Sequence, residues 1–184
     1  MTGYQLPVTA QIGGKLYHLR ADFRNVLEIF SWLERQELPE FLRWRVAVEL
    51  FYEETVEKAD LPEAMEYLAR FLRAGEEESP VGLRLFSWQQ DARHIMAGVN
   101  KAAGQELRQV EFVHWWTFLS WFHAMGEGSF LTLVSIRDKL ARGKKLESWE
   151  QEFYRQNKEQ VLLKKPEDPA SREEKEKLLK RLDA

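Results

Sequence analysis

The chain contains 184 residues, of which 44% are hydrophobic and 31% charged, so it is long enough to build one globular domain with a real core. Its net charge of −3 provides no overall basic field that could hold a nucleic-acid backbone. The absence of cysteine excludes disulfides, thiol catalysis and metal–thiolate sites, in agreement with a reducing, intracellular setting.

Two short strands are predicted at the start of the chain, over residues 8–12 and 15–19. Gly13 and Gly14 lie between them and can adopt positive φ, which is a hairpin signal. Because a lone hairpin is marginal in water, we expect it to pack on the helices that follow.

Three helices are predicted next. Asp22 is a good N-cap for the first helix, over residues 23–35. The second covers residues 41–54, where apolar residues recur every three or four positions. The third covers residues 63–73 and ends near Gly75, a residue type that favours helix C-caps.

Four more helices are predicted after a polar loop, at about residues 87–103, 110–125, 130–141 and 148–163. The first and the last of these open on capping-box patterns, which begin at Ser87 and Ser148. We therefore expect a mainly α fold, in which a short N-terminal β-hairpin precedes about seven helices in one domain over residues 1–165.

The chain beyond residue 165 has a different character. Pro166 and Pro169 interrupt it, and a last short helix that Ser171 could cap is dense in alternating charge. Its few leucines offer little apolar surface to bury. Residues 166–184 are therefore predicted to form a charged, mobile C-terminal tail.

The densest feature of the sequence is the stretch 110–122, which holds three tryptophans and three phenylalanines. Aromatic side chains bury about 150–250 Å² each, so this cluster is core, partner surface or membrane anchor. A helix that is apolar over most of its circumference is usually a central one, so we expect His114, Trp115 and Trp116 to form a core hub. Trp121 is the residue favoured to reach the surface as a partner anchor.

Two further observations concern the aromatic residues and membranes. Tryptophans 32, 44, 88 and 149 occur one per predicted helix and are expected to pack in the core. The stretch 110–122 is interrupted by Glu111 and His114, which makes it too polar to span a bilayer. The N-terminus lacks the basic and apolar regions of a signal peptide, so no membrane partner is expected.

Several short stretches occur in the order found in a known family. They are the Gly13-Gly14 hairpin followed by Asp22-Phe23-Arg24, then Val48-Glu49-Leu50-Phe51-Tyr52, Arg73-Ala74-Gly75-Glu76, Gln90-Asp91-Ala92, His114-Trp115-Trp116-x-Phe118 and Phe153-Tyr154-Arg155. The ordered set covers roughly residues 10–163 and resembles the bacteriophage Gp15 protein family of siphophages and prophages. Family members often have Asp-Gly at the hairpin turn, where this chain has two glycines.

The resemblance implies a small helical protein encoded between the major tail protein and the tape-measure protein of a long-tailed phage. Proteins in that place commonly act as tail assembly chaperones, which keep the tape-measure protein soluble and recruit tail-tube subunits. The implied partners are the phage tape-measure protein and the major tail protein, and the implied location is the host cytoplasm. A structural component of the phage tail is the alternative. Self-association is also expected, because one small domain cannot cover a long helical client.

Two acid-x-x-His pairs raise the question of a metal site. Asp91 and His94 are spaced one helical turn apart, and Glu111 and His114 repeat that spacing. Facing helices can hold metals in this way, although the di-iron pattern requires two Glu-x-x-His motifs and two further glutamates. We favour the interpretation that Asp91 and His114 are hydrogen-bonded among helices and that His94 and Glu111 are partly exposed. No metal or cofactor is therefore predicted.

No catalytic residues are predicted either. The serines at positions 87, 129, 148 and 171 lie where helix caps are expected, and no glycine pair is followed by the lysine and hydroxyl of a phosphate loop. A basic patch is better explained by the helix macrodipole than by a nucleic-acid site; it comprises Lys139, Arg142, Lys144 and Lys145. A metal-dependent enzyme and a DNA-binding regulator are the remaining alternatives to a non-catalytic binding protein.

Overall fold

The protein is mainly helical in the computed structural model, which describes residues 5–76 and 82–164. Its elements are β1 (Thr9–Ile12), β2 (Lys15–His18), α1 (Phe23–Leu33), α2 (Glu40–Phe51), α3 (Leu61–Leu72), α4 (Ala92–Ala103), the 3₁₀ helix η1 (Leu107–Gln109), α5 (Trp115–His123), α6 (Ser129–Ala141), α7 (Ser148–Gln156) and α8 (Lys158–Val161). The predicted tail over 166–184 and its short helix lie outside the described residues. The mainly α fold with an N-terminal hairpin is confirmed.

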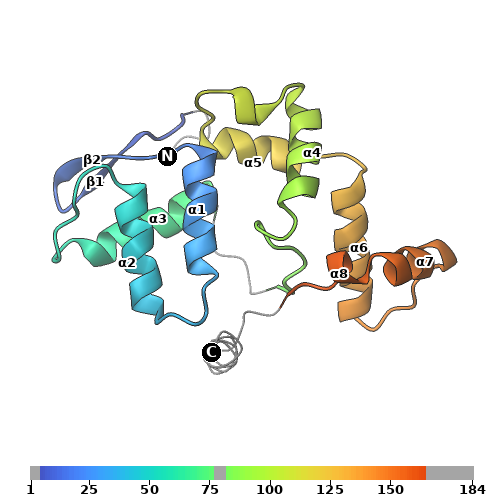
Figure 1. Cartoon of the computed structure of the whole chain (residues 1–184). Helices are drawn as coiled ribbons and strands as arrows, with labels where there is room; N and C mark the ends of the chain where they lie inside the picture. The colour runs from blue at the N-terminus through green and yellow to red at the C-terminus, as the bar shows by residue number, and fades with distance from the viewer. Residues whose placement is uncertain (1–4, 77–81, 165–184) are drawn as a thin grey trace, which may run out of the picture.

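The elements follow one another from end to end of the molecule (Figure 1). The hairpin and α1–α3 lie at one end, α4 and α5 lie in the middle, and α6–α8 lie at the other end. The main apolar core joins the hairpin, α1–α5 and the first half of α6. A second, smaller core lies among α6, α8 and the start of α7, around Leu133, Ile136, Leu146 and Val161.

The hairpin forms as the sequence predicts. β1 and β2 pair antiparallel, with Thr9 opposite His18 and Ile12 opposite Lys15. Gly13 and Gly14 have φ values of 55° and 77°, which suits the primed turns that connect two-residue hairpins. The strands pack on the helices through their buried face, whose residues are Ala10, Ile12 and Tyr17.

Helix α1 begins at its predicted cap, because the Asp22 carboxylate accepts the Arg24 backbone N–H at 2.9 Å. Helix α2, by contrast, ends at Phe51, three residues before the predicted end. Tyr52 is extended and buried, forms a β-bridge with Leu19 and donates its hydroxyl to the Ala64 carbonyl at 3.0 Å. The tertiary pairing therefore overrides the helical pattern at this position.

The predicted helix over 110–125 is shorter than expected and begins at Trp115. Two backbone bonds hold the preceding segment against the start of α1: Phe23 N–H donates to the Val113 carbonyl at 2.9 Å, and Trp115 N–H donates to the Ala21 carbonyl at 2.8 Å. His114 also forms a β-bridge with Asp22. An extended pairing with residues far away in the sequence thus replaces the first helical turn.

Two other predicted helix starts are corrected. Residues 88–91 form a turn, so α4 begins at Ala92. The turn is closed by the Ser87 hydroxyl, which accepts the Gln90 N–H at 3.3 Å. The second capping box is built by Glu147 with Glu150, rather than by Ser148. Asn157 then divides the predicted helix over 148–163 into α7 and α8.

Candidate functional site

His114 caps the N-terminus of α5. Its Nδ1 accepts the Trp116 backbone N–H at 3.1 Å, and its Nε2 lies 3.0 Å from the Pro7 carbonyl oxygen. Because Nδ1 accepts this hydrogen bond, the neutral ring carries its proton on Nε2, and the Nε2–H donates a hydrogen bond to the Pro7 carbonyl. Burial lowers the pKa of His114, which favours this neutral ring. The imidazole thereby joins α5 to the N-terminal segment.

The two adjacent tryptophans attach α5 to the end of α3. The Trp115 indole donates to the Leu72 carbonyl at 3.0 Å, and the Trp116 indole donates to the Phe71 carbonyl at 2.9 Å. These carbonyls lie in the last turn of α3, where the usual i+4 donors are missing, and the Phe71 carbonyl also accepts the Ala74 N–H at 3.0 Å. Both tryptophans are buried, so this end of α5 is fixed in the core.

The far end of α5 reaches the surface. Trp121 is half-buried at the edge of the main core, and its role as a partner anchor stays a prediction. Helix α5 is followed by Met125 and by the connection that leads into α6. This connection faces α4 across a groove of about 350 Å³.

The groove has walls of small side chains. Ala97, Gly98 and Ala102 of α4 form one wall, and residues 124–131, which comprise the connection and the first turn of α6, form the other. Gly98 allows the two walls to approach, since a Cβ built there would lie 2.3 Å from the Met125 sulfur. His94 Nδ1 lies 2.8 Å from the Ser129 hydroxyl and links the walls at one end. The result is a largely apolar groove that a side chain or helix of a partner could enter.

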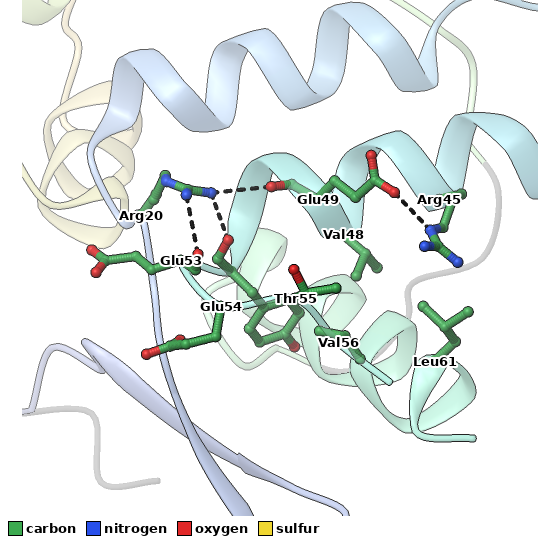
Figure 2. A pocket seen from close by; sticks show the side chains of 10 residues that line it. Arg20, Arg45, Val48, Glu49, Glu53, Glu54, Thr55, Val56 and Leu61 are labelled. Atoms are coloured by element: carbon green, nitrogen blue, oxygen red, sulfur yellow. Dashed lines mark hydrogen bonds and ion pairs between the residues drawn. The ribbon is translucent and has the colours of Figure 1, made fainter. Parts of the chain in front are cut away.

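A second hollow, of about 310 Å³, lies beside the C-terminus of α2 (Figure 2). Figure 2 shows that Arg20 turns to the backbone carbonyls at the end of this helix, which include those of Glu49 at 3.0 Å and Tyr52 at 2.5 Å. Arg45 pairs with the Glu49 side chain at 2.8 Å. Because these cations are engaged by the chain itself, we regard the hollow as part of the helix cap.

The predicted acid-x-x-His pairs do not come together as a metal site. The Asp91 carboxylate binds Arg137, whereas His94 contacts Ser129. Glu111 is exposed and precedes α5, so it and His114 do not share a helix as the spacing predicted. Over residues 5–76 and 82–164, no three His, Asp or Glu side chains are grouped so that they could hold a metal ion.

The sequence interpretation missed Arg137, which joins the two cores. Its guanidinium forms two bonds with the Asp91 carboxylate, at 2.7 and 2.8 Å, and both side chains are buried. It also donates to three backbone carbonyls, those of Leu85, Gln160 and Val161. A sequence signal existed, because Arg137 follows Leu133 at the i+4 spacing that places both residues on one helix face.

The predicted basic patch is partly engaged in ion pairs. Lys139 binds the buried carboxylate of Glu150 at 2.7 Å, and Arg142 binds Asp138 at 2.6 Å. Both cations lie near the C-terminus of α6, the end where the helix dipole favours positive charge.

Comparison with known proteins gives one match. A family model described as Bacteriophage Gp15 protein matches residues 4–163, which include every described element and the groove. No curated protein and no solved structure shows significant similarity to the chain. Among the described helices, none combines the length and the apolar character needed to cross a membrane.

Proposed function

The chain belongs to the bacteriophage Gp15 protein family, and on this basis we propose that it is a non-catalytic phage tail morphogenesis protein. In this proposal it acts in the host cytoplasm as a tail assembly chaperone that binds the tape-measure protein. The observation that carries the proposal is the apolar groove between α4 and the connection from α5 to α6. A long helical client offers the kind of amphipathic stripe that such grooves accept.

The chemistry of the groove supports a helical client. Small side chains on α4, such as Ala97 and Ala102, let the backbone of a partner helix approach closely. The charged residues that line the groove are Lys101 and Glu127, and His94 and Ser129 are its other polar side chains. A client helix with apolar residues on one face and charges along its borders would match this arrangement.

The rigidity of the groove also supports binding. One wall continues from α5, whose opposite end is fixed to α3 by the Trp115 and Trp116 indoles. The other wall is a regular helix. A site whose walls are ordered before binding loses little conformational entropy when the partner arrives. Trp121, half-buried on α5, is the side chain that we propose as an additional anchor.

Co-expression with the tape-measure protein tests the proposal. The wild-type chain should keep the tape measure soluble and co-purify with it. Ala97→Glu introduces a charge into the apolar groove and should reduce the recovered tape measure by about tenfold, which corresponds to about 1.4 kcal/mol. Ala92→Glu is the matched control, because Ala92 is an exposed residue of the same helix outside the groove lining.

The same experiment separates the proposed function from its alternative. If the tape measure is equally soluble without this chain and does not co-purify with it, the chaperone function is wrong. A structural component of the phage tail would then be the better assignment, and binding to the major tail protein would be tested next. If Ala97→Glu and Ala92→Glu behave alike, the chain binds its client through another surface.

A further inference from the structure

The hairpin has one open edge. Leu19 N–H donates to the Val8 carbonyl at 3.0 Å, so the backbone groups of Val8 point toward β2. Because the direction alternates along a strand, those of Ala10 and Ile12 point toward β2 as well. The backbone groups of Thr9 and Gln11 therefore point away from β2. Within the described parts of the chain, no group accepts the N–H of either residue.

The opposite edge of the hairpin is closed by the chain itself. The His18 carbonyl accepts the Glu53 N–H at 3.0 Å, and the His18 N–H donates to the Glu54 carboxylate at 2.8 Å. Within the described residues, the β2 edge is therefore engaged at its His18 end, and we place a further strand on the β1 edge. Figure 1 shows that the hairpin lies at one end of the molecule, where another molecule could approach it.

The open edge is short and has defined limits. Pro7 has no N–H to donate, and the Gly13 N–H is already bonded to Glu63 at 3.0 Å. The free donors are thus those of Thr9 and Gln11, which flank Ala10. The Thr9 carbonyl receives a long bond of 3.3 Å from the Tyr67 hydroxyl and retains a second lone pair.

These limits favour one self-complementary register. If Ala10 lies opposite Ala10 of a second antiparallel copy, Thr9 of each chain faces Gln11 of the other. Each facing pair exchanges two backbone hydrogen bonds, so four bonds form. A shift by two residues places Thr9 opposite Thr9 or Gln11 opposite Gln11. The outer bonds would then need the Pro7 carbonyl, which already accepts from His114 at 3.0 Å, or the backbone of Gly13, which lies in the turn with a φ of 55°.

The composition of the edge favours the same partner. Residues 6–12 carry no charge, whereas natural edge strands are usually protected by charged side chains. Two copies can therefore pair here without like-charge repulsion. Leu6, Val8 and Leu16 are about half exposed on or beside the strands and provide apolar surface to cover.

We propose that β1 pairs antiparallel with β1 of a second copy of this chain, centred on Ala10, and so forms a four-stranded sheet across a two-fold axis. This deepens the self-association in the proposed function and gives it a site distinct from the client groove. Four backbone bonds make a small interface, so the dimer is weak in solution. It becomes significant when many copies are gathered on one client.

Cross-linking tests the register directly. The chain has no cysteine, so Thr9→Cys and Gln11→Cys each introduce a unique thiol. Directly opposed hydrogen-bonded residues have Cα atoms about 5.5 Å apart, within the reach of a disulfide, whereas diagonal neighbours are about 7–8 Å apart. With oxidised glutathione, a mixture of the two variants should therefore yield disulfide-linked heterodimer at least about tenfold faster than either variant yields homodimer.

The results distinguish specific β1–β1 pairing from random collision of the introduced thiols. Equal rates in the mixture and in the separate variants would refute this register, and no cross-link together with a monomer at every concentration in sedimentation would refute the dimer. Gln11→Pro, which removes one edge donor, should shift wild-type self-association toward monomer, whereas Gln11→Ala should not. None of these measurements uses the tape-measure protein, so their results do not depend on the client groove.

Discussion

Burial distinguishes tryptophans that the sequence alone could not tell apart. Trp115 is fully buried and its indole is hydrogen-bonded, whereas Trp149 is 55% exposed. The prediction that Trp149 packs in the core is wrong. Because Glu147 caps α7, Trp149 lies in the first turn of that helix. There the Trp149 indole N–H donates to the Glu147 carboxylate at 3.0 Å.

Truncation of these two tryptophans should have very different effects. Trp115→Ala removes a fully buried side chain and should lower the free energy of unfolding by about 3–5 kcal/mol. Trp149→Ala, the matched control, should change it by no more than about 0.5 kcal/mol. Urea unfolding followed by circular dichroism measures both. If the two variants unfold at the same urea concentration, Trp115 does not occupy the core position described above.

His114 predicts a loss of stability in mild acid. Burial lowers its pKa in the folded state, whereas the unfolded value is about 6.5. Above that pH the ring is neutral in both states. As the pH falls below about 6.5, the unfolded chain takes up the proton first, so folding becomes less favourable. Protonation of Nδ1 would also remove the acceptor of the Trp116 N–H.

The comparison of His114→Asn with wild type isolates this effect. Asparagine is a good N-cap that does not titrate, so the variant should lose less stability than wild type between pH 7 and pH 5. His18 acts in the opposite direction, because its hydrogen bond with Glu54 raises its pKa and adds stability at low pH. Both chains should therefore also carry His18→Gln. Equal pH dependence in the two chains would show that His114 does not contribute.

At the scale of elements, Arg137 holds α6 against α4 and α8. Arg137→Ala would leave the Asp91 carboxylate buried without its partner, together with three carbonyls, and should lower the free energy of unfolding by about 3–5 kcal/mol. Arg142→Ala, at the C-cap of the same helix, is the matched control, since Arg142 is exposed and its pair with the half-buried Asp138 should contribute less than about 1 kcal/mol. Thermal unfolding of both variants measures the difference. Similar melting temperatures would contradict a joining role for Arg137.

Local patterns in the sequence were sufficient for most elements. The glycine pair between β1 and β2, the Asp22 cap and the spacing of apolar residues identify the hairpin and most helices. Two of the boundaries that failed depend on distant partners: α2 ends where Tyr52 pairs with Leu19, and α5 begins after 113–115 have paired with 21–23. Such contacts leave no periodic signal in the segment itself.

The groove was beyond prediction for a related reason. Its small α4 residues are unremarkable in the sequence, and Gly98 has a role only because Met125 packs against it. The aromatic stretch indicates α5 as a site, yet its tryptophans Trp115 and Trp116 are buried. The groove is instead lined by residues that follow the end of that helix. Arg137 could have been identified from its place on an apolar helix face.

For the whole molecule, the two candidate contacts lie on separate elements. The open edge of β1 belongs to the hairpin at one end, and the groove lies between α4 and the connection to α6. One copy could therefore bind a client and a second copy at the same time. Repetition of both contacts would coat a long client with copies that stabilise one another.

Such a client complex should depend little on salt. The chain has a net charge of −3, and the groove is lined mainly by small apolar residues, so apolar burial rather than charge should supply the affinity. Between about 0.01 and 0.15 M salt the Debye length falls from about 30 to 8 Å, which would weaken a complex held by exposed charges. We expect the dissociation constant for a groove-binding tape-measure segment to change by no more than about threefold across this range. Isothermal titration calorimetry at several salt concentrations measures it. A steep loss of affinity would indicate a charged surface, such as that around Lys144 and Lys145, as the site of binding.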